Sequence, residues 1–152
     1  MDNYYAYFSR ALCALFEETG LGDCHEKGSG KKTSFEVITN IGVTGQVKGC
    51  LMMKTDFRTA SEISNSMLSG IGHSENEEGF TSMQKAAITE FTNQFGARAI
   101  MFMSDDGIDC NITPPTIITG QTVESQTFQI TQAVEKEFSS PFGSIFLYLG
   151  LQ

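Results

Sequence analysis

The feature of the sequence that most restricts its fold is a long helical pattern between residues 81 and 103. When successive residues are placed about 100° apart around a helix axis, the large apolar side chains fall within one sector of roughly 80°. This stripe consists of Ile88, Phe91, Phe95, Ala99 and Phe102. A helix of about six turns with one apolar face is stable when that face packs against another layer. We therefore predict a layered domain in which the stripe faces the core.

The opposite side of the same helix carries small and polar residues. Ala86, Glu90, Asn93 and Ala97 lie within roughly 60° of one another on the helical projection. Glu90 and Asn93 are one turn apart and face away from the predicted core. The alanines keep the surrounding surface low, which lets a partner approach closely. Glutamate and asparagine are also common on solvated helix faces, so this spacing alone does not identify an active site.

The remaining patterns predict a mixed α/β (α+β) chain that forms a single domain over residues 1–152. Residues 4–19 have helical spacing and end at Gly20, and Asp56 is placed to cap another helix that Gly70 closes. Two strand-like runs, over residues 34–41 and 46–54, are predicted to form a hairpin. Three further runs cover residues 108–118, which Pro114-Pro115 interrupts, residues 128–134 and residues 142–149. The last run is apolar enough to pair across a sheet edge. Residues 22–32 and 73–79 are predicted loops.

Charge and composition exclude several classes of partner. A net charge of −8 disfavours nucleic acid and anionic membranes, because both polyanions repel it. The four cysteines include no C-x-x-C pair, which is typical of reduced intracellular thiols. No apolar run approaches the ~20 residues that span a bilayer, and the first residues do not resemble a secretion signal. We therefore expect a cytoplasmic protein, with its scattered methionines filling the core.

The segment Glu90-Phe91-Thr92-Asn93 resembles the E-x-x-N signature of the CheC/CheX/FliY family of chemotaxis phosphatases. Residues 56–60, 63 and 67–70 are similar to the second helix of that family, and residues 112–120 to the proline-containing strand that follows its active helix. A single E-x-x-N is present, so the chain resembles CheX rather than CheC-type members, which usually carry two. It departs from the family after the motif, where Gly-Asn-Ala is common and this chain has Ala97-Arg98-Ala99, with Gly96 one place early.

This resemblance implies a mainly antiparallel sheet packed against long helices, and a homodimer. It also implies a phosphatase that removes the aspartyl phosphate of a phosphorylated CheY-like response regulator, in chemotaxis or another two-component pathway. Asn93 would orient the attacking water, Glu90 would pair with a lysine of the regulator, and Ala86 and Ala97 would line the contact. This chain would bind no cofactor, since the regulator supplies Mg²⁺. The alternative is a non-catalytic module that binds a response regulator or scaffolds a signalling complex.

Three further segments contain residues that are capable of chemistry, and each has a more ordinary interpretation. Cys24-His25-Glu26 combines a nucleophile with metal ligands, but adjacent residues rarely converge on one point. His73, Glu75, Glu77 and Glu78 are typical of a solvated acidic loop. Residues 28–32 contain glycine and lysine without the spacing of a phosphate-binding loop.

Overall fold

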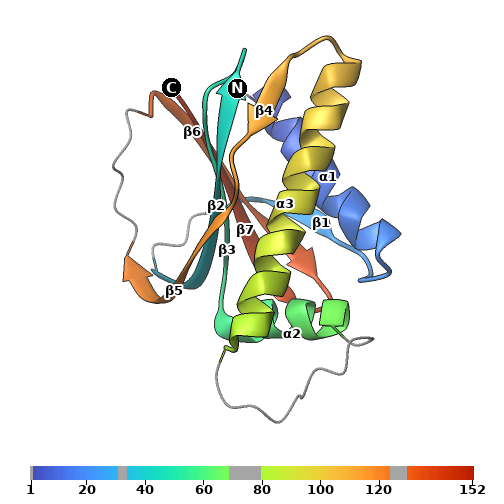
Figure 1. Cartoon of the computed structure of the whole chain (residues 1–152), viewed down its shortest axis with the longest axis vertical. Coiled ribbons are helices and arrows are strands. Elements are labelled where there is room, and N and C mark those ends of the chain that lie inside the picture. The colour runs from blue at the N-terminus through green and yellow to red at the C-terminus, as the bar shows by residue number, and fades with distance from the viewer. Residues whose placement is uncertain (1, 31–33, 69–79, 124–129) are drawn as a thin grey trace.

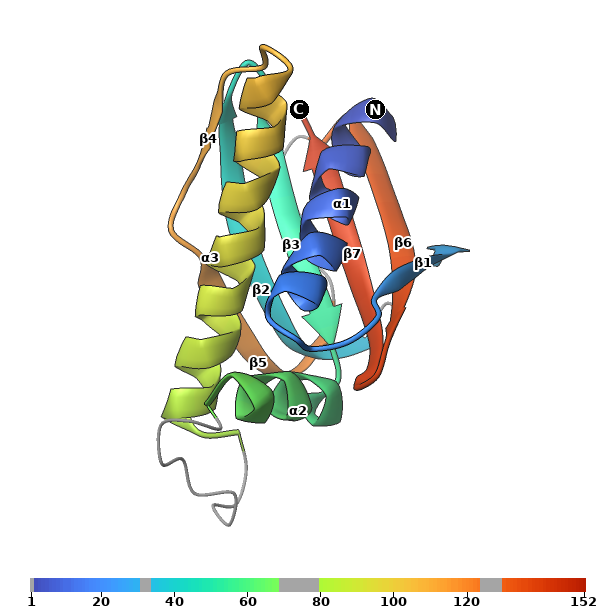
Figure 2. The same ribbon diagram turned by 90° about the vertical axis from the view of Figure 1, so that its right-hand side faces the viewer.

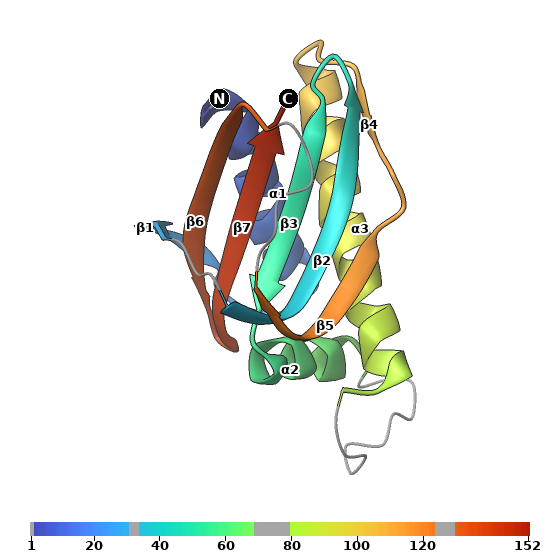
Figure 3. The same cartoon turned by 90° about the vertical axis from the view of Figure 1, so that its left-hand side faces the viewer.

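One antiparallel sheet and three helices make up the described part of the chain. The computed structural model of the chain describes residues 2–30, 34–68, 80–123 and 130–152. The helices are α1 (Asp2–Glu18), α2 (Phe57–Leu68) and α3 (Ser82–Asp105). α1 and α3 lie side by side over one face of the sheet, and α2 crosses its end (Figures 1 and 2). Figure 3 shows that no described helix covers the opposite face. The predicted α+β class, with a mainly antiparallel sheet against long helices, is confirmed.

The sheet has seven strands in the order β1-β6-β7-β3-β2-β4, and β5 also pairs with β2. Every pairing is antiparallel. The strands are β1 (His25–Ser29), β2 (Ser34–Gly45), β3 (Gly49–Thr55), β4 (Cys110–Ile112), β5 (Thr116–Val123), β6 (Gln132–Ser140) and β7 (Gly143–Leu151).

The predicted hairpin and the predicted proline break are both confirmed. β2 and β3 pair around Ile41 and Leu51, although β2 continues to Gly45, beyond the predicted end. β4 and β5 both pair with β2, and Pro114-Pro115 separates them. Proline has no backbone N–H to donate, so the ladder is interrupted at this point.

Three predictions about strands were wrong. Residues 25–29 form the edge strand β1 rather than part of a loop; its side chains are mostly exposed and polar, so no apolar alternation marks it. β6 ends at Ser140, whereas the predicted strand ended at residue 134. The prediction stopped early because the charged residues from Glu135 to Glu137 hide the strand pattern. Residues 128 and 129 of the predicted strand lie outside the described residues. The last strand, β7, is not an edge, since it lies between β6 and β3, and its apolar sequence reflects that interior place.

Local capping fixes where α2 starts. The Asp56 carboxylate accepts a hydrogen bond from the Thr59 backbone N–H at 2.8 Å, as the sequence predicted. Gly70, the predicted end of this helix, lies outside the described residues. Side chains of α1, α2 and α3 share one apolar core with the inner face of the sheet. Within it, Phe16 of α1 meets Phe91 of α3 edge to face, with ring centroids 5.6 Å apart.

Candidate active site

The start of α3 is set by a capping box. The Thr81 hydroxyl accepts from the Gln84 backbone N–H at 3.1 Å, and the Gln84 side chain accepts from the Thr81 backbone N–H at 2.9 Å. The Gln84 amide also donates to Asn65 of α2 at 3.0 Å. These bonds fix the beginning of the helix against α2, two turns before Glu90.

One side of α3 is buried, largely as the sequence predicted. Ile88, Phe91, Phe95 and Ala99 are fully buried in the core. Phe102 is half-buried instead, and the Arg10 guanidinium of α1 lies 3.9 Å from its ring centroid. The side chain that is fully buried near this end of the helix is Met103. The predicted stripe is therefore correct over three turns and wrong in the last one.

Two contacts with β2 fix the rotation of α3 about its axis. The hydroxyls of Thr92 and Thr39 are 2.7 Å apart and both residues are fully buried. Gly96 lies so close to the sheet that a Cβ atom there would come 2.8 Å from Cδ1 of Ile41. Because Thr92 points at the sheet, Asn93 and Glu90 are turned toward solvent.

The four predicted site residues come together on the outer face of α3. Glu90, Ala86 and Ala97 are exposed and Asn93 is half-buried. The Glu90 carboxylate accepts one long hydrogen bond, 3.4 Å from the Gln94 amide. Among the described residues, none hydrogen-bonds to the Asn93 side-chain amide. Both of its polar groups are therefore available to a water molecule or a partner.

The same face carries two exposed methionines, although the sequence predicted that the methionines fill the core. Met83 is 46% exposed and Met101 is 60% exposed, whereas Met53 and Met103 are buried. On the helical projection Met83 and Met101 lie within about 20° of Glu90, so the sequence did contain the signal. Exposed methionine is a common feature of protein contact surfaces.

The structure shows what Arg98 contacts at the point where the sequence departs from the family that it resembles. Arg98 is turned away from the outer face and forms an ion pair with Glu18 at the end of α1. This pair lowers the pKa of Glu18 through the hydrogen bond that Arg98 donates. Arg98 therefore joins two helices and leaves Ala97 as the surface residue beside Asn93.

Of the other sequence candidates, the one that lies fully within the described residues does not form a site. In Cys24-His25-Glu26 the three side chains diverge: the His25 ring is 2.9 Å from Asp23, Glu26 is 3.4 Å from Lys136, and Cys24 is buried. Gly28 and Ser29 belong to β1, while Lys31 and Lys32 lie outside the described residues, as do His73, Glu75, Glu77 and Glu78.

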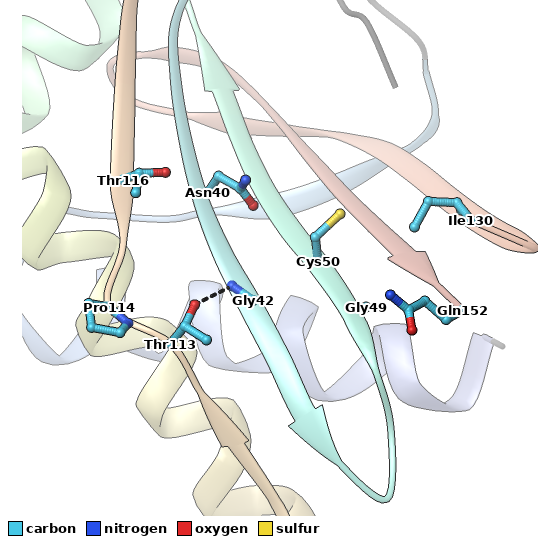
Figure 4. A pocket seen from close by; sticks show the side chains of 9 residues that line it. All are labelled: Asn40, Gly42, Gly49, Cys50, Thr113, Pro114, Thr116, Ile130 and Gln152. Atoms are coloured by element: carbon cyan, nitrogen blue, oxygen red, sulfur yellow. Dashed lines mark hydrogen bonds between the residues drawn. The ribbon is translucent and has the colours of Figure 1, made fainter. Parts of the chain in front are cut away.

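A hollow of about 220 Å³ lies on the helix-free face of the sheet (Figure 4). It is lined by β2, β3 and the segment between β4 and β5, where the Thr113 hydroxyl accepts from the Gly42 backbone N–H at 2.8 Å. Asn40 points into it, whereas its neighbours Thr39 and Ile41 point to the helices. The sheet therefore separates this hollow from Glu90 and Asn93.

Neither a metal centre nor a membrane helix is found in the described part of the chain. No group of three or more His, Cys, Asp or Glu side chains there is arranged to hold a metal ion. No helix among the same residues is long and apolar enough to cross a membrane.

Solved structures with the same arrangement of elements define the class of this fold. A CheC-like superfamily protein from Shewanella sp. PV-4 superposes with a TM-score of 0.82 at 22% identity, over 98% of this chain and 97% of its own. CheX of Borrelia burgdorferi, solved as a complex of CheX, CheY, BeF3 and Mg²⁺, superposes with a TM-score of 0.79 at 21% identity, over 98% and 97% of the two chains. The fold is therefore of the CheC/CheX type.

Sequence comparison assigns the family within this class. Residues 37–138, about two thirds of the chain, match the family described as chemotaxis phosphatase CheX. The chain belongs to the CheX family. The CheY-P phosphatase CheX of Thermotoga maritima is 27% identical over 94 residues, which cover 62% of this chain and 58% of that relative.

Proposed function

We propose that this protein is a phosphatase that hydrolyses the aspartyl phosphate of a CheY-like response regulator. The observation that carries the proposal is the position of Asn93. Its amide is on the solvent side of α3, free of hydrogen bonds to described residues, and one turn from Glu90 in a chain of the CheX family. The partner's identity is supported by the Borrelia relative, which was solved with CheY.

The chemistry requires positioning more than acid or base catalysis. In an acyl phosphate the aspartate carboxylate is a good leaving group, so the P–O bond breaks readily once water attacks phosphorus in line with it. The products are inorganic phosphate and the free carboxylate, and a proton is released to solvent. The Asn93 amide has both an acceptor and a donor. Its carbonyl oxygen accepts a hydrogen bond from the attacking water, and its NH2 group is able to donate a second hydrogen bond. Asparagine cannot take up a proton at neutral pH, so Asn93 orients the water without acting as a base.

Glu90 provides a docking contact in this proposal. Its carboxylate is exposed and accepts one long hydrogen bond from Gln94. A stronger hydrogen-bond donor on a partner protein can replace this bond at a small cost in free energy. A lysine of the regulator would form a charge-assisted hydrogen bond with it and so fix the register of the two proteins. Ala86 and Ala97 would let the regulator's surface approach the helix, and Met83 and Met101 would extend the contact along it.

The remaining partners are also proposals. Mg²⁺ would belong to the regulator, where it neutralises charge on the phosphoryl group; the Borrelia complex contains Mg²⁺, and no described residues here form a metal cluster. We further propose a cytoplasmic homodimer whose chain is one domain over residues 1–152. The Ala97-Arg98 departure is the sequence feature that favours the non-catalytic alternative. Because Arg98 is engaged with Glu18, it does not obstruct Asn93, and this favours the enzyme.

The test is the loss of the phosphoryl group from CheY-like receivers that have been phosphorylated with acetyl phosphate. We expect Asn93→Ala to lower the rate by about 100-fold or more, because the water is no longer oriented. Affinity for the phosphorylated receiver should stay within about threefold, since the amide contributes little to docking. Asn3→Ala, the same change at an exposed position of α1, is the control and should retain full activity. An active Asn93→Ala protein would refute the assignment, and phosphorylation-dependent binding by an inactive wild type would support the non-catalytic module.

Glu90→Gln tests the docking role separately. Loss of the charge should slow association with the receiver and reduce the dependence of affinity on salt concentration. Glu17→Gln makes the same change at an exposed residue of α1 and controls for net charge. Binding kinetics at low and high salt that do not differ between the two variants would exclude a docking role for Glu90.

A further inference from the structure

The exposed side chains of α3 form one strip along the helix. On the helical projection the exposed residues between positions 83 and 101 lie within about 80° of one another. They are Met83, Ala86, Glu90, Gln94, Ala97 and Met101, which we call the outer strip. The two methionines are five turns apart, so they lie on one line about 27 Å apart along the axis. Asn93 lies at the edge of the strip, about 15 Å along the axis from Met83 and about 12 Å from Met101.

Two of the three exposed large apolar side chains among the described residues belong to this strip. Met83 is 46% exposed and Met101 is 60% exposed, and the third is Ile118, at 50%. Ile118 lies on the other side of the sheet, because its neighbour Ile117 packs against the core and successive strand residues point to opposite faces. The exposed apolar surface of α3 is therefore placed on both sides of Glu90 and Asn93.

The outer strip carries one charge, although the chain has 18 acidic and 10 basic residues. Glu90 is the charged residue of the strip. Arg98 is engaged with Glu18, and Lys85 lies about 140° from Glu90 on the helical projection. One carboxylate pairs with one cation, so the complementary surface is apolar around a single basic side chain. A folded protein surface fits this description better than a polyanion or a strongly basic peptide.

The side chains give the strip a low middle and two raised ends. Ala86 and Ala97 lie between the methionines and end at Cβ, whereas a methionine side chain reaches farther and has three rotatable bonds. A partner surface that protrudes toward Asn93 is therefore contacted at both ends of the strip. Methionine is flexible and polarisable, so these two side chains can adapt to apolar patches of different shape.

We propose that Met83 and Met101 are the two anchors that bind the receiver, and that they determine affinity whereas Asn93 determines rate. The receiver surface that fits has its phosphorylation site and one basic side chain at the centre. An apolar patch lies on each side, about 15 Å and about 12 Å from that centre. This inference rests on the proposed phosphatase function and adds the residues that determine how tightly the regulator is bound.

The experiment measures binding of the full chain to CheY-like receivers that carry BeF3 and Mg²⁺, as in the Borrelia complex, and hydrolysis of the same receivers after phosphorylation with acetyl phosphate. Met83→Ala and Met101→Ala should each weaken binding and raise KM by about five- to tenfold, because each removes the burial of about half a methionine side chain. The two positions are far apart, so the double variant should lose about 25- to 100-fold. The value of kcat should stay within about twofold, since neither methionine touches the reacting atoms.

Two variants are the controls. Ile118→Ala removes an apolar side chain of similar exposure from the other side of the sheet and should bind like the wild type. Met101→Leu keeps the apolar volume and should bind within about twofold of the wild type. Alanine is a better helix former than methionine, so weaker binding by Met101→Ala is not explained by a loss of helix. Thermal unfolding of each variant checks this.

The outcomes separate the anchors from the phosphatase activity. Weaker binding by the methionine variants, with no hydrolysis by the wild type, would support the anchors and reject the phosphatase. Hydrolysis by every variant with unchanged KM and affinity would reject the anchors and support the phosphatase. A wild type that binds no receiver would overturn the proposal. It would also be overturned if the methionine variants changed only from dimer to monomer in light scattering, because the strip would then bind a second copy of the chain.

Discussion

The contact of Gly96 with the sheet leads to a quantitative prediction about packing beneath the candidate site. A Cβ atom at this position would lie 2.8 Å from Cδ1 of Ile41 and 3.3 Å from Cδ1 of Ile112. Ile41 is fully buried in β2. Gly96→Ala therefore forces α3 or Ile41 to move, even though alanine is the better helix former.

The two effects have opposite signs and can be compared. Replacing glycine by alanine within a helix stabilises it by about 1 kcal/mol. Overpacking a core by one methyl group costs about 1–3 kcal/mol. We expect Gly96→Ala to lower the free energy of unfolding by about 0–2 kcal/mol, the difference between these terms. Ile41→Val alone removes the clashing Cδ1 atom and should cost about 0.5–1.5 kcal/mol.

The double variant distinguishes this explanation from a general loss of stability. With valine at position 41 the new Cβ enters the vacated space. The double variant should therefore lose less free energy of unfolding than the sum of the losses of the two single variants, by about 1 kcal/mol or more. Urea unfolding followed by circular dichroism measures all four proteins. Gly96→Ala combined with Ile63→Val, a fully buried isoleucine of α2, is the control and should be additive. Additive behaviour at Ile41 would refute the reasoning.

Three other predictions follow from contacts of α3. Thr92→Val leaves the Thr39 hydroxyl buried without its 2.7 Å partner and should cost about 1–3 kcal/mol in urea unfolding; an unchanged midpoint would contradict this. Arg98 lowers the pKa of Glu18 in the folded protein. The ion pair therefore stabilises the fold fully at pH values above the pKa that Glu18 has in the unfolded chain. This stabilisation is lost as the pH falls through the lowered pKa of the folded state. Arg98→Gln should therefore flatten the acid side of a stability–pH profile, and an unchanged profile would argue against the ion pair. Ala97→Phe should leave stability within about 0.5 kcal/mol but weaken receiver binding in a titration, because Ala97 is exposed; equal binding would place the contact elsewhere.

Periodicity predicted the parts of the fold that depend on a single element. The stripe from Ile88 to Ala99 is buried, whereas Glu90 on the opposite side is exposed and Asn93 is half-buried, because a helix has one period and a core lies on one side. Phe102 departs from the pattern: it is half-buried, and the Arg10 guanidinium of α1 lies over its ring, a contact between residues 92 positions apart that no local pattern reports.

Strand placement was predicted less well, because sheet neighbours come from distant parts of the chain. β1 is stabilised by pairing with β6, more than 100 residues later, and its own exposed sequence lacks an apolar signal. β7 has the apolar sequence of a strand, but its sequence could not say that β6 and β3 would flank it.

The sequence by itself determined that α3 presents Glu90 and Asn93 on one side and a core stripe on the other, since both follow from helix geometry. Tertiary structure decided which way that helix is turned: the Thr92–Thr39 hydroxyl pair and the contact of Gly96 with Ile41 set its rotation against β2. It also decided that Arg98 points to Glu18. Such contacts depend on how separate elements pack against one another. That packing is determined by the whole close-packed core and not by any single segment.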